Sequence, residues 1–299
     1  MKLHQIQALV AIAETGSVRA AARRLGLTQP ALSKSLAALE EELSVPLVHR
    51  TARGANLTKF GQSIVTRGRG ISQEIERLRD EIEQMRGAAR GGVTVAISPS
   101  PALLLLPAVL QRFHREFPAI QVRVRESVYP DTVQLLREGL ADFAVGAQPP
   151  SRKTSTSEFL TERLYENKLV VACRSDHPKA GVRSLRDLLD CEWLQHGSAE
   201  GPGSLYAPVF RENGLPVPTP WLVSDSFLSS LNLLESSDAL SLLPARLVAH
   251  LARAGRLTAL PLQEPMPDWD VSLILRAQVP LTPIALKLAQ LFRRIPPSD

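Results

Sequence analysis

The sequence predicts a multi-domain α+β protein with a helical first part, one long connecting helix and a two-lobed α/β part behind it. Residues 1–58 carry short helical patterns separated by tight turns. Residues 59–90 carry one helical pattern that contains no proline. From residue 91 onward, strand patterns alternate with helical patterns, which is typical of a mostly parallel sheet with helical crossovers.

Composition limits the class of protein. The 299 residues are enough for two or three domains, and 44% hydrophobic with 22% charged residues is typical of a folded chain. No apolar stretch approaches the roughly 20 residues of a membrane helix, and the first residues do not form a signal peptide. We therefore expect a cytoplasmic protein without a membrane partner. The unpaired spacing of Cys173 and Cys191 favours two reduced core thiols.

The excess positive charge lies entirely in the first third of the chain. Residues 1–90 hold 14 Lys and Arg against 9 Asp and Glu, whereas the remaining residues hold 21 of each kind. Because nucleic acids attract basic surfaces, this asymmetry favours a polyanionic partner for the first third alone.

Residues 16–58 contain the signals of two helices joined by a tight turn. Ser17 is a plausible N-cap of a helix from Val18 to Leu25, which Gly26 ends. Thr28 caps a second helix, and its inward face carries Leu32, Leu36 and Leu39. The pattern predicts a helix-turn-helix, whose second helix enters the DNA major groove. The alternative is a generic helical hairpin with solvated basic residues.

The outward positions of this motif are the candidate DNA contacts. Gln29 suits adenine, Ser33 suits several bases, and Lys34 suits guanine or phosphate. Phosphate contacts are expected from the basic residues Arg19, Arg23 and Arg24 of the first helix. They are also expected at the start of the second helix, at Thr28 and Pro30, because a helix N-terminus favours an anion. Residues 47–58 predict a short hairpin with Arg50 and Arg53 at its tip. Such a wing places its arginines in a minor groove.

The stretch AAARRLGLTQPALSKSLAALEEELSVPLVHRT closely resembles the signature of the LysR-type transcriptional regulators. The matching positions are Ala21, Ala22, Leu25, Thr28 to Ser33, Leu39 to Leu43, Pro46, Leu47, Arg50, Leu57 and Thr58. Ser44 stands where glycine is usual and Val48 where phenylalanine is usual, which puts the local turn and core packing in doubt.

The family's length and two-part layout match the whole chain. The resemblance implies a winged helix-turn-helix at 1–58, a linker helix at 59–90 and a periplasmic-binding-protein-like effector domain at 91–299. The first lobe of that domain is expected at about 91–161 and 267–299, and the second at about 162–266.

The linker helix carries an apolar stripe at heptad spacing, formed by Ile64, Ile71, Ile75, Leu78, Ile82 and Met85. We expect a homodimer through this stripe; the alternative is that the stripe packs on the chain's own body. The resemblance implies a homotetramer, assembled further through the effector domains, with RNA polymerase as a further partner.

Strands of the α/β part are predicted at 93–97, 120–126, 141–147, 168–174, 221–224, 241–244 and 269–277. Helices are predicted at 103–117, 131–139, 184–190, 203–214, 226–236, 245–254 and 282–295. Ligands of such sheets bind beyond the carboxyl ends of strands. The polar and aromatic candidates there are Ser98, Ser100, Ser127, Gln148, His196, Ser198 and Phe227, each of which can instead be a structural residue.

No Arg or Lys is clearly directed at this cleft, so hydroxyls and backbone dipoles are expected to hold an anion. The resemblance implies that the loop at 98–102 binds the effector's acidic group. It also suggests a small, aromatic organic anion and kinship to regulators of aromatic sulfonate or carboxylate degradation. No cofactor is expected.

Two other classes of protein compete with this prediction. An enzyme is disfavoured because the chain lacks G-x-S-x-G, a Walker A loop, a strand-linked G-x-G-x-x-G and H-E-x-x-H. A solute-binding protein without a transcriptional role would suit the two-lobed part alone. The basic first third argues against it.

Overall fold

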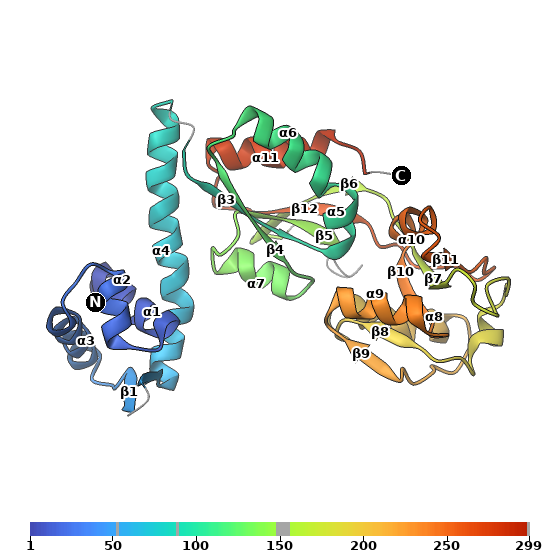
Figure 1. Cartoon of the computed structure of the whole chain (residues 1–299), viewed down its shortest axis with the longest axis horizontal. Coiled ribbons are helices and arrows are strands. Elements are labelled where there is room, and N and C mark those ends of the chain that lie inside the picture. The colour runs from blue at the N-terminus through green and yellow to red at the C-terminus, as the bar shows by residue number, and fades with distance from the viewer. Residues whose placement is uncertain (52–53, 88–89, 148–155, 298–299) are drawn as a thin grey trace. The chain divides into compact units, whose positions relative to one another are not determined.

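The computed structural model describes residues 1–51, 54–87, 90–147 and 156–297. Two compact units make up the chain (Figure 1). One comprises Met1–Glu83 with Arg137–Leu140, and the other comprises Gln84–Leu136 with Ala141–Asp299. Among the described residues, no helix is both long and apolar enough to cross a membrane.

Three helices form the core of the first unit: α1 (Leu3–Thr15), α2 (Val18–Arg24) and α3 (Gln29–Leu43). Ala21 and Ala22 of α2 are buried, and their small side chains let α2 cross its neighbours closely. Burying one leucine contributes about 1.5–3 kcal/mol. The largest buried side chains here include Leu9, Ile12, Leu32, Leu36, Leu39 and Leu47, which confirms the predicted inward face of α3.

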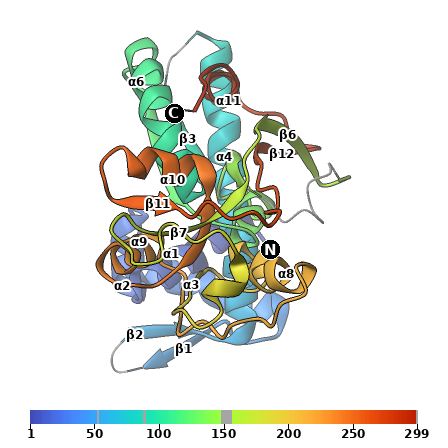
Figure 2. The same cartoon turned by 90° about the vertical axis from the view of Figure 1, so that its right-hand side faces the viewer.

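A two-stranded hairpin follows, made of β1 (Val48–Thr51) and β2 (Gly54–Leu57), which pair antiparallel (Figure 2). Gly54 has a φ of 142°, and a Cβ there would lie 2.5 Å from the carbonyl oxygen of Gly16. That carbonyl accepts a hydrogen bond from the N–H of Ala55 at 2.9 Å. Only glycine permits this approach, so the hairpin is held against the end of α1.

The linker helix α4 (Lys59–Met85) is a single helix of 27 residues. Val65 is buried in the core of the first unit, and Ile64 packs against that core from its edge. A Cβ at Gly68 would clash with Ile6 of α1. The start of α4 is therefore fixed on the helical core, and the first member of the predicted stripe packs on the chain's own body.

The first lobe of the second unit has a five-stranded sheet in the order β4-β3-β5-β12-β6. The strands are β3 (Gly92–Ile97), β4 (Gln121–Glu126), β5 (Phe143–Ala147), β6 (Phe159–Tyr165) and β12 (Val271–Arg276). Strand β3 is parallel to β4 and β5, whereas β12 is antiparallel to β5 and β6. The sheet is therefore mixed.

Helices cover both faces of this sheet. Helices α6 (Leu106–Glu116) and α11 (Pro283–Arg294) pack on one face, and α7 (Asp131–Arg137) packs on the other (Figure 1). The single helix predicted at 103–117 is wrong, because α5 (Pro99–Leu104) ends at Leu104 and α6 begins at Leu106.

The second lobe has the antiparallel sheet β10-β7-β11 and the parallel pair β8-β9. Its strands are β7 (Leu169–Arg174), β8 (Leu194–His196), β9 (Leu222–Ser224), β10 (Ser241–Pro244) and β11 (Leu257–Ala259). Its helices are α8 (Tyr206–Glu212), α9 (Phe227–Ser236), α10 (Ala245–Ala252) and two short 3₁₀ turns, η2 (Leu185–Leu188) and η3 (Pro202–Leu205). Both cysteines are free thiols, and burial raises the pKa of Cys173 to about 11.

Two crossing segments join the lobes, and Asn167 ties them together. Its backbone N–H donates to Asp270 Oδ1 at 3.1 Å, and its carbonyl accepts from the N–H of Trp269 at 2.7 Å. Its side-chain Oδ1 accepts from the N–H groups of Lys168 and Arg246 at 3.0 and 3.3 Å. Because β6 continues to Tyr165, the first lobe extends beyond the predicted limit of residue 161.

Candidate DNA-binding surface and effector cavity

The start of α3 has the geometry that the sequence predicts. The Thr28 side chain accepts a hydrogen bond from the N–H of Ala31 at 3.4 Å, and Pro30 occupies the first turn. Thr28, Gln29, Pro30 and Lys34 are exposed, and Ser33 is half-buried. One surface of the helix thus presents a capped N-terminus, an amide, a hydroxyl and an ammonium group. Their contacts with DNA remain predictions.

The basic residues of α2 divide into two kinds. Arg19 and Arg23 are exposed and form no ion pair in the described part of the chain. Arg24 differs, because its Nη1 lies 2.6 Å from the Glu14 carboxylate. Arg19 and Arg23 therefore have no competing carboxylate, and the phosphate contacts of all three arginines remain predictions.

The tip of the wing is described only in part. Arg50 lies in β1 opposite Ala55 of β2, and Arg53 lies outside the described residues. The prediction that these arginines reach a minor groove remains open.

Glu40 fixes the wing to α3, a role that the sequence analysis missed. Its carboxylate accepts hydrogen bonds from the N–H groups of Leu47 and Val48 at 2.7 and 3.1 Å. At the other end of the hairpin, Thr58 Oγ1 donates to the Pro46 carbonyl at 2.7 Å and accepts from the N–H of Gly61 at 3.1 Å. The Leu-Glu-x-x-Leu part of the motif was the available signal for Glu40.

Ser44 ends α3 in the left-handed conformation, with a φ of 54°. Glycine reaches this region without steric cost, which explains its usual presence at this position of the family pattern. The turn forms with serine in place, so the departure from the pattern leaves the motif intact.

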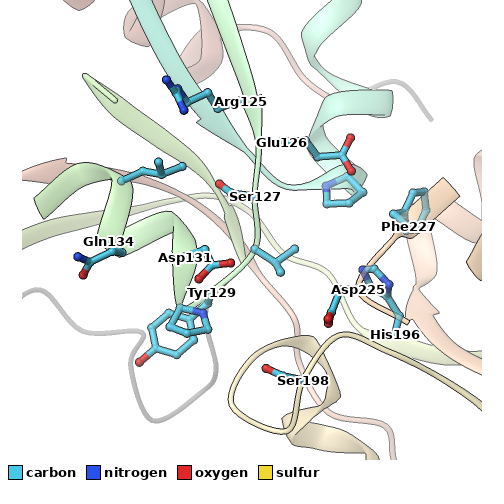
Figure 3. A pocket seen from close by; sticks show the side chains of 14 residues that line it. Arg125, Glu126, Ser127, Tyr129, Asp131, Gln134, His196, Ser198, Asp225 and Phe227 are labelled. Carbon is cyan, nitrogen blue, oxygen red and sulfur yellow. The ribbon is translucent and has the colours of Figure 1, made fainter. Parts of the chain in front are cut away.

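Two adjoining cavities lie in the second unit, one of about 780 Å³ and one of about 50 Å³. Both lobes line each of them, and the two cavities share Pro99, Val128, His196 and Phe227. Polar groups of the larger cavity are Arg125, Glu126, Ser127, Tyr129, Asp131, Gln134, Ser198 and Asp225 (Figure 3). The smaller cavity is mainly apolar, with Leu169, Leu242, Leu243, Leu247 and Trp269 in its wall.

The structure brings most of the predicted effector residues to these cavities. Ser127 and Ser198 line the larger cavity, and Ser98 and Ser100 line the smaller one. His196 and Phe227 line both, whereas Gln148 lies outside the described residues. Their role in binding an effector remains a prediction.

Several lining residues were not predicted. Glu126 ends β4, Asp131 begins α7 and Asp225 follows β9, and no local sequence motif marks these residues as functional. Arg125 also lines the larger cavity. Its guanidinium points away from His196 and Asp225 (Figure 3).

His196 stands where the two cavities adjoin. Its ring contacts Phe227 edge to face, with 5.5 Å between the ring centroids. Its Nδ1 lies 3.4 Å from Ser230 Oγ, and its buried Nε2 has no hydrogen-bond partner. Burial lowers the pKa of His196, while the Ser224 backbone and the Asp225 carboxylate oppose that effect. The imidazole is therefore neutral near pH 7 and has one ring nitrogen free for a ligand.

Ser100 is the second polar group with an unmet bond in this region. Its side chain is 7% exposed, and its Oγ has no hydrogen-bond partner. Burial raises the pKa of Tyr165 to about 12, against the effects of the Ser100 hydroxyl and Arg246. Tyr165 Oη likewise has no hydrogen-bond partner. A buried hydroxyl without a partner is costly, so the site favours a polar guest.

A wing-bearing DNA-binding fold followed by a two-lobed domain with an inter-lobe cavity defines a ligand-responsive, DNA-binding regulator. Comparison with protein families identifies the family of regulators to which the chain belongs. The bacterial regulatory helix-turn-helix model of the lysR family matches residues 3–62, and the LysR substrate binding domain model matches residues 86–295. The chain belongs to the LysR family, whose members are transcriptional regulators and not enzymes.

Individual relatives agree with this assignment. A probable nitrogen assimilation transcriptional activator of Synechococcus elongatus is 30% identical, over 95% of this chain and 92% of the relative. The regulator GalR of Pseudomonas putida is 29% identical, over 97% of this chain and 73% of the relative.

Among solved structures, the LysR-family regulator CbnR has a TM-score of 0.72 at 23% identity, with 98% of this chain and 99% of CbnR covered. CbnR in complex with its target DNA has a TM-score of 0.70 at 23% identity, with 98% and 99% covered. At this identity the likeness supports the fold.

Proposed function

We propose that this LysR-type regulator binds a specific DNA sequence and responds to a small organic anion held between the lobes of its second unit. The observation that carries the proposal is the pair of adjoining cavities, which both lobes line and in which Ser100 and His196 have unpartnered polar atoms. A ligand there bonds to both lobes at once. It therefore favours one arrangement of the lobes over another.

The chemistry of the smaller cavity supports an effector with an acidic group and an apolar body. The Ser100 hydroxyl can donate to carboxylate or sulfonate oxygens, and Ser98 lies in the same wall. Phe227 and Trp269 offer aromatic surfaces to the body of the ligand. We therefore propose an aromatic carboxylate or sulfonate, and with it a regulator of aromatic compound catabolism.

We also propose that two copies pair through the apolar stripe of α4. Ile71, Leu78, Ile82 and Met85 are 45%, 56%, 49% and 75% exposed. A helix with such a stripe gains stability by packing against a second copy at heptad spacing. Dimers that pair further through their effector domains would form a homotetramer, and RNA polymerase is the further partner.

The proposed mechanism is a shift between two lobe arrangements that changes the spacing or bending of bound DNA. A ligand moves such an equilibrium only by its differential affinity, and a shift from 1:99 to 99:1 requires about 5.5 kcal/mol. The two crossing segments that Asn167 ties together are the place where the lobes can move relative to each other.

The first test is a thermal-shift screen of organic carboxylates and sulfonates on the full chain. A ligand at 100 times its dissociation constant stabilises by about 2.7 kcal/mol. The replacement Ser100→Ala should weaken the best hit, whereas Ser204→Ala, outside both cavities, should not. Footprinting of the operator with and without the hit then tests the mechanism. An unchanged footprint and bend, with transcription still responding, would falsify it.

A further inference from the structure

Three carboxylates line the larger cavity. Glu126 ends β4, Asp131 begins α7 and Asp225 follows β9 (Figure 3). All three residues are exposed to the solvent of the groove. None of them has an ion-pair partner or a side-chain hydrogen bond in the described part of the chain.

Among the described lining residues, little positive charge faces these carboxylates. Arg125 is the one Arg or Lys side chain in that described set, and it points away from His196 and Asp225 (Figure 3). His196 beside Asp225 is neutral near pH 7, because burial lowers its pKa. The larger cavity is therefore acidic, in contrast to the anion-binding chemistry expected of the smaller one.

The position of Asp131 has an ordinary explanation, whereas those of Glu126 and Asp225 do not. A carboxylate in the first turn of a helix interacts favourably with its N-terminal N–H groups, so Asp131 stabilises α7. Glu126 and Asp225 belong to opposite lobes and line one groove. Like charges repel as they approach, so closure of the lobes is opposed until a cation lies between them.

Independent evidence for a ligand comes from the adjoining smaller cavity. Ser100 is more than nine-tenths buried with no partner for its hydroxyl, and the neighbouring His196 Nε2 is also unpartnered. The Ser100 hydroxyl offers a hydrogen bond to an acceptor at one end of the combined cavity. The carboxylates offer a place for a donor with positive charge at the other end.

We propose that the effector carries a protonated amino group, held between Glu126 and Asp225, in addition to its acidic group. The chemical class is an organic acid that also carries an amine, such as an amino acid. This inference rests on the proposed function, since it concerns the ligand of the same inter-lobe site. Charge neutralisation across the groove then couples binding to lobe closure.

The test compares three probes that share one skeleton: phenylalanine, 3-phenylpropionate and 2-phenylethylamine. Thermal shift and calorimetry on the full chain should show tighter binding of phenylalanine than of 3-phenylpropionate. The same comparison uses leucine, 4-methylpentanoate and isopentylamine, so that the size of the apolar body does not decide the result. A charge-assisted hydrogen bond lost from the site corresponds to a loss of affinity of about tenfold or more.

Variants separate the amino group from the acidic group. Glu126→Gln and Asp225→Asn should each weaken the amino acid about tenfold and leave the amine-free acid unchanged. Asp190→Asn, an exposed carboxylate outside both cavities, is the matched control.

The two proposals fail in different ways. If no amino acid or amine binds more tightly than its amine-free acid, or if both variants weaken all probes equally, the amino-group inference is overturned. If the acids bind, depend on Ser100 and alter the operator footprint, the proposed function stands without the inference. If no cavity ligand alters the footprint, the proposed function falls as well.

Discussion

At the scale of single residues, the wing depends on a carboxylate that contacts no DNA. Glu40 accepts two backbone hydrogen bonds from the start of β1, and no other side chain bonds to these N–H groups in the described chain. Glu40→Ala should lower the free energy of unfolding by about 2–3 kcal/mol, because two N–H groups lose an ionised acceptor. Denaturant unfolding followed by circular dichroism measures this.

Two further variants identify the cause. Glu40→Gln retains an acceptor oxygen and should lose less than Glu40→Ala. Glu41→Ala, which removes an exposed carboxylate from the next position, should change stability by less than about 0.5 kcal/mol. Equal losses in Glu40→Ala and Glu41→Ala would contradict the assignment.

Ser44 carries backbone strain that glycine would relieve. The left-handed conformation costs an L-residue about 1–2 kcal/mol. Glycine avoids this cost, but it loses more conformational entropy on folding, which offsets part of the gain. Ser44→Gly should therefore raise the free energy of unfolding by about 0.5–1 kcal/mol. Ser35→Gly, inside the same helix, should lower it. A loss of stability in both variants would show that Ser44 is not strained.

His196 makes the stability of the effector unit depend on pH. Burial lowers its pKa below the ordinary value of 6.5, so the unfolded chain binds the proton more tightly than the folded chain. The contribution of His196 to the free energy of unfolding is fully present above pH 6.5. It is lost as the pH falls below 6.5 and through the lower pKa of the folded state. The melting temperature should therefore drop between pH 7.5 and pH 5.5.

His196→Gln should reduce this drop, whereas His114→Gln, at an exposed position, should leave it unchanged. If the melting temperatures of the wild type and of His196→Gln fell by the same amount over this pH range, the role of His196 would be disproved.

At the scale of elements, the sequence predicted those helices that are stabilised by interactions between residues close together in the chain. The caps Ser17 and Thr28 and the periodic leucines of α3 act within a few residues, so the sequence alone specified α2, the turn and α3. Strands β6, β8 and β11 were missed, because two of them have three residues and β6 lies at a sheet edge. The break between α5 and α6 was hidden by the apolar run at residues 103–106, although Pro107 marked the start of α6.

The cavity was predictable only in part for a related reason. Ser98 and Ser100 follow a recognisable strand, which is a local feature. Glu126 and Asp225 are separated by most of a lobe in the sequence, and only the fold brings both to one groove. No sequence pattern predicts that Glu126 and Asp225 line the same groove.

The stripe of α4 gives the element-scale prediction. Leu78→Glu combined with Ile82→Glu places four charges in a pair of helices, where each buried apolar side chain contributes about 1.5–3 kcal/mol. The dissociation constant of the dimer should rise at least about 100-fold, as measured by analytical ultracentrifugation. Ser63→Glu adds charge to α4 away from the stripe and should leave the dimer intact. Unchanged dimerisation of the double variant would exclude this interface.

At the scale of the whole molecule, the uneven charge separates two tasks. The first third holds all the surplus positive charge, and the remainder is neutral. The net charge therefore favours phosphate attraction by the first third over attraction by the rest of the chain. The same division predicts that base readout and phosphate binding respond differently to mutation and to salt.

Arg23→Ala should weaken binding to operator and random duplexes alike and lower the slope of log affinity against log salt by about 1. Gln29→Ala should cost about 1–3 kcal/mol on the operator and little on random DNA, because an amide reads a base edge rather than a phosphate. Fluorescence anisotropy at several salt concentrations measures both quantities, with Arg24→Ala as a comparison, since Arg24 is ion-paired with Glu14. If Gln29→Ala weakened both duplexes equally, the exposed face of α3 would not be the surface that reads sequence.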